Sequence, residues 1–127
     1  MILTVSTSSA ASLPPCPSSP NCVSTLANDW HAIAPIHYTA TQGEAMLRLL
    51  AVLRAVARST IVESGPNVVR VEFRTRIFRF VDDAQFVFED RTKTIHFRSA
   101  ARAGHSDMGV NRRRMEEIRK AFESTHG

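Results

Sequence analysis

The fold is decided by residues 69–98, which read VRVEFRTRIFRFVDDAQFVFEDRTKTIHFR. Apolar and polar residues alternate in three runs of this stretch, around Val71, Phe86 and Ile95. Alternation with a period of two is typical of strands that bury one face. The phase slips near Phe78, where we expect a bulge or a bend. The connections are too short for parallel crossovers, so the pattern predicts antiparallel neighbours.

Two helices are predicted to flank these strands. Thr41 to Glu44 has the pattern of a capping box, and apolar residues follow it at helical spacing. A second helix is expected from about Asn111 to Ser124, with Asn111 as its N-cap. Before the first helix, His31 to Tyr38 predicts an edge strand or an extended arm, since Pro35 cannot donate to a central ladder. The order predicts an α+β fold, an antiparallel meander sheet of four to five strands packed against two helices in a two-layer sandwich.

Length and composition predict a single folded unit. The chain has 127 residues, of which 43% are hydrophobic, enough for a core without metal or disulfide support. Residues 1–15 are rich in Ser, Thr and Pro and predict a flexible leader, followed by one globular domain over 16–127. No run approaches the ~20 apolar residues of a membrane span. Met1 to Val5 lack a basic region, which favours a cytoplasmic protein, with a processed envelope, periplasmic or plastid protein as the alternative.

Two cysteines, Cys16 and Cys22, lie in the segment CPSSPNC. The prolines of this segment bend the chain, so the thiols could form a small-loop disulfide or remain reduced, and both readings stay open. A zinc site needs two more soft ligands, and the five histidines do not have the spacing. We therefore expect no metal and no cofactor.

Positive charge is concentrated in the second half of the chain. The net charge is +4, and 14 of the 16 basic residues are arginine. Residues 1–64 hold three charges of each sign, whereas the part after Gly65 holds thirteen bases and nine acids. The excess is modest, and Glu116 and Glu117 can pair with the arginines before them in the second helix. Because the strands carry no mixed aromatic and basic pattern, we expect no nucleic-acid partner.

The most informative polar stretch is RSAARAGHSDMGVNRRR, Arg98 to Arg114. Its last three arginines open a helix, where positive charge opposes the macrodipole. A negative group should lie nearby, either internal, from Asp82, Asp83 or Asp107, or external, as a bound anion. The residues that we expect to bind a small anion or a partner protein are Arg98, Arg102, Asn111, Arg112 and Arg114.

Three motifs in this order resemble the signatures of the domain of unknown function 1499 family. They are CPSSPNCVS at residues 16–24, FVDD at 80–83, and the stretch at 98–114. The resemblance covers the chain from about residue 16 to 122. It implies almost nothing about activity, because the family has no assigned function. Ala101 replaces the usual second serine of the third motif, and Gln85 stands where an acid is common.

The hypothesis that the protein is an enzyme depends on its acidic residues and one serine. Asp82 and Asp83 could act as general acid and base or hold a metal, but adjacent strand residues point to opposite faces. A turn in which this pair makes salt bridges to the arginines is favoured. Ser99 is a conceivable nucleophile without an indicated base. The consecutive residues 105–107, His-Ser-Asp, cannot form a hydrogen-bonded triad.

Three functional hypotheses follow. The first is a small noncatalytic accessory or binding domain, whose arginine and aspartate cluster binds an anion or a partner protein. The second is a hydrolase or metal-dependent enzyme that uses Asp82, Asp83 and Asp107, with Arg98 and Arg102 holding an anionic substrate. The resemblance also suggests a third, a subunit of an envelope or organellar membrane-associated complex.

Overall fold

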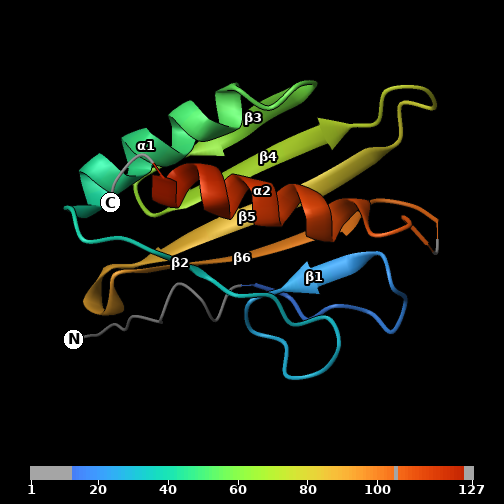
Figure 1. Cartoon of the computed structure of the whole chain (residues 1–127), viewed down its shortest axis with the longest axis horizontal. Helices are drawn as coiled ribbons and strands as arrows, with labels where there is room; N and C mark the ends of the chain where they lie inside the picture. Colours follow the sequence, from blue (N-terminus) through green and yellow to red (C-terminus); the bar gives the residue numbers. More distant parts are fainter. Residues whose placement is uncertain (1–12, 105, 125–127) are drawn as a thin grey trace, which may run out of the picture.

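An antiparallel sheet of six strands carries both helices on one of its faces (Figure 1). The computed structural model describes residues 13–104 and 106–124. Of the leader predicted over 1–15, residues 1–12 lie outside this description, and Leu13 is buried against the folded chain. The predicted α+β class, with two helices on a largely meandering antiparallel sheet, is confirmed.

Four long strands form the meander. They are β3 (Ser59–Ser64), β4 (Val68–Arg74), β5 (Val81–Glu89) and β6 (Thr94–Ala101), and the 3-10 turn η2 (Asp90–Thr92) joins the last two. The free edge of β6 is shared by two short strands, β1 (Cys22–Ser24) near its end and β2 (Ile36–His37) near its start. The helices are α1 (Gln42–Arg54) and α2 (Val110–Ser124). Among the described residues, no helix has the length and apolarity required to cross a membrane.

Alternation along the strands places the core between the sheet and the helices. Val71 lies opposite Ala84, and Phe86 lies opposite Phe97. The largest fully buried side chains come from both layers: Phe73, Phe86, Phe88 and Phe97 from the sheet, Leu49 and Leu53 from α1, and Met115 and Phe122 from α2. The other face of the sheet carries the intervening polar residues.

The predicted capping box starts α1. The Thr41 hydroxyl accepts from the Glu44 N–H at 3.2 Å, and the Glu44 carboxylate accepts from the Thr41 N–H at 3.3 Å. Two of the unpaired donors of the first turn are therefore satisfied by one local motif, as the sequence predicts.

The phase slip near Phe78, where a bulge or a bend is predicted, marks a bend of the chain, the hairpin loop between β4 and β5. Residues 75–80 connect β4 to β5, and the bulge lies in β3 between Ile61 and Glu63. The predicted turn at Asp82 and Asp83 is wrong, because both residues belong to β5. A buried aspartate occupies an inward position of this strand, where the pattern leads one to expect an apolar residue, and so conceals the start of β5.

The sequence gives no indication of β1. Its residues pair with β6 in the register Cys22 to Ala100 and Ser24 to Arg98, but they lie in a segment whose Ser and Pro content is typical of a loop. The arm predicted around Pro35 contains the two-residue strand β2. The N-terminal segment thus completes the sheet on the far side of the meander (Figure 1).

Candidate functional site

Asp82 and Asp83 point to opposite faces of the sheet. Asp82 lies beneath α2, where its Oδ2 accepts from Arg114 Nη1 at 3.0 Å. The side chains of the pair are only 4% and 14% exposed, and the Arg114 guanidinium also lies 4.5 Å from the centre of the Phe73 ring. This carboxylate is therefore an internal partner of α2.

Asp83 lies on the other face, opposite Glu72 of β4. Two carboxylates in this position repel each other, and Arg102 bridges them. Its Nε and Nη2 donate to Asp83 at 3.0 and 2.7 Å, and Nη2 also donates to Glu72 at 2.9 Å. The hydrogen bonds to Asp83 and then to Glu72 raise the pKa of Arg102. The Arg102 guanidinium is therefore held by two carboxylates of the sheet.

Ser99, Asn111 and Asp107 form a chain of hydrogen bonds at the start of α2. The buried Ser99 hydroxyl donates to Asn111 Oδ1 at 2.5 Å, and Asn111 Nδ2 donates to Asp107 Oδ2 at 2.7 Å. Asp107 also accepts from the N–H groups of Gly109 and Asn111. Asn111 is therefore not the N-cap that the sequence predicts, because it lies inside the first turn, and Asp107 satisfies the helix start.

Asp82 and Asp107 line one cavity of about 340 Å³, whereas Asp83 lies on the other face of the sheet. Each accepts from guanidinium, amide or backbone donors, and Ser99 donates to an amide oxygen. The carboxylates that the enzyme hypothesis requires together do not converge. Within the described ranges, no group of three His, Cys, Asp or Glu side chains has a metal-binding arrangement.

The remaining arginines of the stretch contact backbone carbonyls. Arg112 donates to the carbonyls of Ala32 and Trp30 at 2.9 and 3.0 Å. Arg98, on the face of Asp83, places Nη2 3.4 Å from the Pro15 carbonyl, and its buried Nε has no hydrogen-bond partner among residues 13–104 and 106–124. Burial lowers the pKa of Arg98, and the charge of Asp83 opposes that shift. Both side chains attach the N-terminal segment to the body of the protein.

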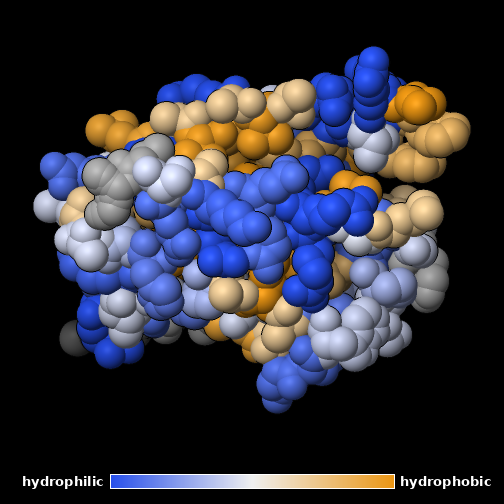
Figure 2. Space-filling view, viewed as in Figure 1, coloured by the Kyte–Doolittle hydropathy of each residue, from blue (hydrophilic) through white to orange (hydrophobic). Residues whose placement is uncertain are grey.

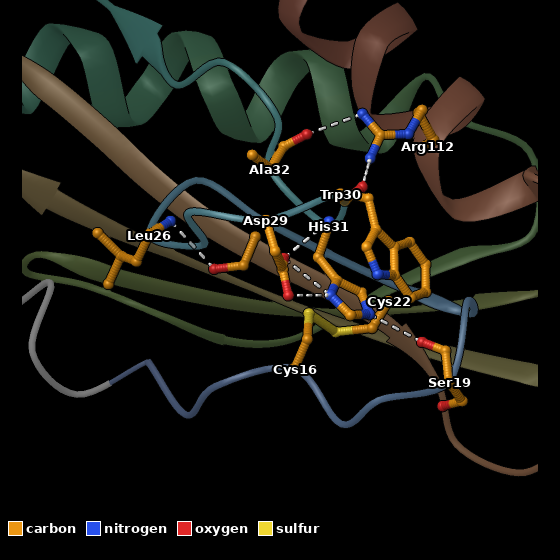
Figure 3. Close-up of polar contacts among 10 residues, drawn as sticks. Cys16, Ser19, Cys22, Leu26, Asp29, Trp30, His31, Ala32 and Arg112 are labelled. Carbon is orange, nitrogen blue, oxygen red and sulfur yellow. Dashed lines mark hydrogen bonds and ion pairs between the residues drawn. A yellow bond between two sulfur atoms is a disulfide. The ribbon is translucent and has the colours of Figure 1, made fainter.

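The first motif folds into a polar loop beside His31 (Figure 3). Cys16 and Cys22 are joined by a disulfide. The carbonyl of Ser19, between them, lies 2.9 Å from His31 Nε2, and Asp29 Oδ1 lies 3.0 Å from Nδ1. Carbonyl and carboxylate oxygens only accept, so both bonds form together only when both ring nitrogens carry hydrogen. Bonds from the His31 N–H and then its ring lower the pKa of Asp29.

The first and third motifs touch each other directly. The buried Asn21 donates from Nδ2 to the Gly104 carbonyl at 2.8 Å and accepts from Ser19 at the same distance. Next to this contact, β1 pairs with the end of β6. Gly104 and Gly109 have φ values of 90° and 80°, in the left-handed region that favours glycine. Polar residues of the first and third motifs therefore join the N-terminal segment to the loop before α2.

Five arginines line a cavity of about 380 Å³ in another part of the molecule. We call it the arginine cavity. Its charged lining residues are Arg58, Arg74, Arg76, Arg113, Arg114 and Glu117. Arg58 and Arg113 donate to the carbonyls of Arg74 and Met108. In the described part of the chain, Arg58, Arg76 and Arg113 make no ion pair. Of these arginines, only Arg114 is among the residues predicted to bind an anion. Arg58 comes from the turn between α1 and β3, and Arg76 comes from the hairpin loop.

An apolar cavity of about 340 Å³ adjoins it, with Phe78, Phe80 and Met108 in its lining. Thr75 and Val110 line both cavities, so the two are immediate neighbours. Figure 2 shows hydrophobic atoms beside strongly hydrophilic ones at the corner where the β4–β5 hairpin lies. We call this part of the molecule, residues 75–80 with the loop before α2, the loop end.

The two adjacent aspartates provide a matched test of burial. Asp82→Ala should lower the free energy of unfolding by about 3 kcal/mol, because it leaves the Arg114 charge buried without a partner. Asp83→Ala removes an exposed pair and should cost less than about 1 kcal/mol. Urea denaturation measures both, and the further change Arg114→Met should restore part of the first loss. Equal losses of unfolding free energy at the two positions would contradict the conclusion that the Asp82 pair is buried and the Asp83 pair is exposed.

Asp107 should make α2 sensitive to acid. Burial alone raises its pKa, but the bonds from Asn111 and Gly109 outweigh burial and hold it below 3.8. The resulting stabilisation is complete above that value and is lost as the pH falls through the lower pKa of the folded state. Asp107→Ala should therefore lower the free energy of unfolding by about 1 kcal/mol at neutral pH. In urea titrations below pH 3.8, the free energies of unfolding of the variant and the unmodified protein should become more similar. Ser106→Ala, a neutral change beside it, should show no such narrowing.

Comparison with known proteins agrees with the motifs. A family model described as "Protein of unknown function (DUF1499)" matches residues 12–122. This match includes all three motifs and most of the chain. No curated protein and no solved structure matches the chain. The chain belongs to the DUF1499 family of proteins of unknown function.

Proposed function

We propose that this protein is a noncatalytic binding module that holds a phosphate-like anion in the arginine cavity. One observation carries the proposal: five arginines and a single carboxylate line one cavity of about 380 Å³. Like charges at this density repel one another, and a bound anion would relieve the repulsion. Guanidinium groups also match the oxygens of phosphate and sulfate in pairs, which favours this class of anion.

The pairing of the arginines with carboxylates supports this choice of site. Arg74 and Arg114 are paired with Glu72 and Asp82, whereas Arg58, Arg76 and Arg113 are exposed and make no ion pair within the described ranges. Arg58 and Arg113 each use one N–H on a backbone carbonyl, so all three guanidinium groups keep donors for a ligand.

This site differs from the one expected from the sequence. Of the five residues predicted to bind an anion, only Arg114 lines the cavity. Arg102 is held by two carboxylates, and Arg112 by two carbonyls. Asn111 is buried and bonded at both ends of its amide. A noncatalytic role fits the same contacts, because each candidate carboxylate accepts from guanidinium, amide or backbone donors and Asp83 lies on the opposite face of the sheet from Asp82.

Titration with inorganic phosphate at constant ionic strength tests the proposal. Phosphate at about ten times its Kd should raise the melting temperature by about 4 °C. The double variant Arg76→Gln/Arg113→Gln should lose this increase. Arg91→Gln is the matched control, because Arg91 is 81% exposed and lies in η2, at the opposite end of β5 from the cavity.

Sulfate should act like phosphate, and chloride at equal ionic strength should not. The absence of any shift in the unmodified protein would overturn the proposal. So would a shift of equal size in the double variant, because the anion would then bind somewhere other than the arginine cavity.

A further inference from the structure

We propose that the loop end docks on the surface of an anionic lipid bilayer. In this arrangement the apolar side chains of residues 75–80 and Met108 enter the interface, and the arginine cavity receives a lipid phosphate group. The inference rests on the proposed anion site and adds the source of the anion. Three observations carry it: exposed apolar side chains, the charge around them, and the contact between the two cavities.

Large apolar side chains are exposed together at this end. Ile77, Phe78 and Phe80 are 78%, 72% and 62% exposed, and Met108 in the neighbouring loop is 83% exposed. The Phe78 and Phe80 rings stack on each other with centroids 5.5 Å apart, so they form one continuous surface. An exposed apolar cluster of this kind marks a contact with a membrane or a protein.

The charge of the loop end suits an anionic surface. The hairpin sequence alternates arginine with apolar residues, from Arg76 to Phe80, and no acidic residue occurs between Glu72 and Asp82. Arg76 and Arg79 are exposed, and their long aliphatic stems can lie along an apolar environment while the charged groups reach the phosphate layer. Positive charges within the Debye length of an anionic membrane are attracted to it.

The two cavities place both kinds of contact side by side. Thr75 and Val110 belong to both linings, so the guanidinium groups adjoin the apolar side chains. A phospholipid has the same order of groups, with a phosphate above acyl chains. In Figure 1 the β4–β5 loop and the loop before α2 end on the same side of the molecule, so both can reach one surface.

A bilayer explains more of these features than a soluble anion does. Inorganic phosphate would use the guanidinium groups but leave Ile77, Phe78 and Met108 in water. The hairpin loop also extends beyond the helices in Figure 1, and a projecting tip with aromatic residues can penetrate the interface, where aromatic side chains are favoured. The docking therefore accounts for the exposed apolar residues and the arginines together.

Co-sedimentation with vesicles tests the inference. The full chain should bind vesicles of phosphatidylcholine mixed with phosphatidylglycerol, bind less as salt increases, and not bind phosphatidylcholine alone. Ile77→Ser/Phe78→Ser should weaken vesicle binding at least about tenfold while keeping the response to inorganic phosphate. Arg76→Gln/Arg113→Gln should weaken vesicle binding about fivefold per arginine and lose the phosphate response.

Two controls match these variants. Leu47→Ser replaces an apolar residue that is 69% exposed on α1, and Arg91→Gln removes a charge at the other end of β5. Both should bind vesicles like the unmodified protein. Binding that persists in Ile77→Ser/Phe78→Ser would show attraction by charge alone and would overturn the docking.

The remaining outcomes separate the two proposals. A phosphate response without vesicle binding would overturn the docking and leave the anion site standing, whereas the loss of both would overturn both. Vesicle binding without a phosphate response would contradict the anion site and the headgroup contact that depends on it. A protein that does not bind vesicles but forms a dimer in light scattering, and loses the dimer in Ile77→Ser/Phe78→Ser, would assign the apolar surface to a second copy. That result would overturn the docking.

Discussion

The buried ion pair between Asp82 and Arg114 fixes the position of α2 on the sheet. A charge in this position is costly unless its partner is correctly placed, so the pair couples the register of β5 to the rotation of α2. The Ser99–Asn111 bond and the Asp107 carboxylate add two further contacts within the same helical turn. The arginine cavity borders these contacts. Arg114 points toward the sheet, so Arg113, the preceding residue of α2, lies on a more exposed side of the helix and lines the cavity.

Much of the fold could be predicted from the sequence because local patterns encode it. Alternation gave the long strands, and the Thr41–Glu44 capping box gave the start of α1. The start of β5 could not be found in this way, because Asp82 is a charge at a core position, whose burial depends on an arginine 32 residues later in the chain. β1 was hidden for a related reason, since only pairing with β6 makes its residues a strand.

The candidate site was less predictable than the fold. Sequence reasoning correctly identified an excess of arginine near the third motif, but proximity in sequence did not separate the paired from the unpaired groups. Arg102 and Arg114 met carboxylates of β5, whereas Arg76 and Arg113, from the hairpin and α2, line one cavity with Arg58. The distinction depends on which face of a strand or helix each residue occupies. The net charge of +4 contains no such information.

The tandem arrangement of β1 and β2 along β6 has a consequence for behaviour in concentrated solution. A long strand with unpaired backbone groups is a template for edge-to-edge association. Strands of three and two residues cover that edge of β6. The opposite edge is β3, where the bulge between Ile61 and Glu63 interrupts regular pairing. The fold thus ends its sheet on both sides with features that discourage a neighbouring molecule from extending it.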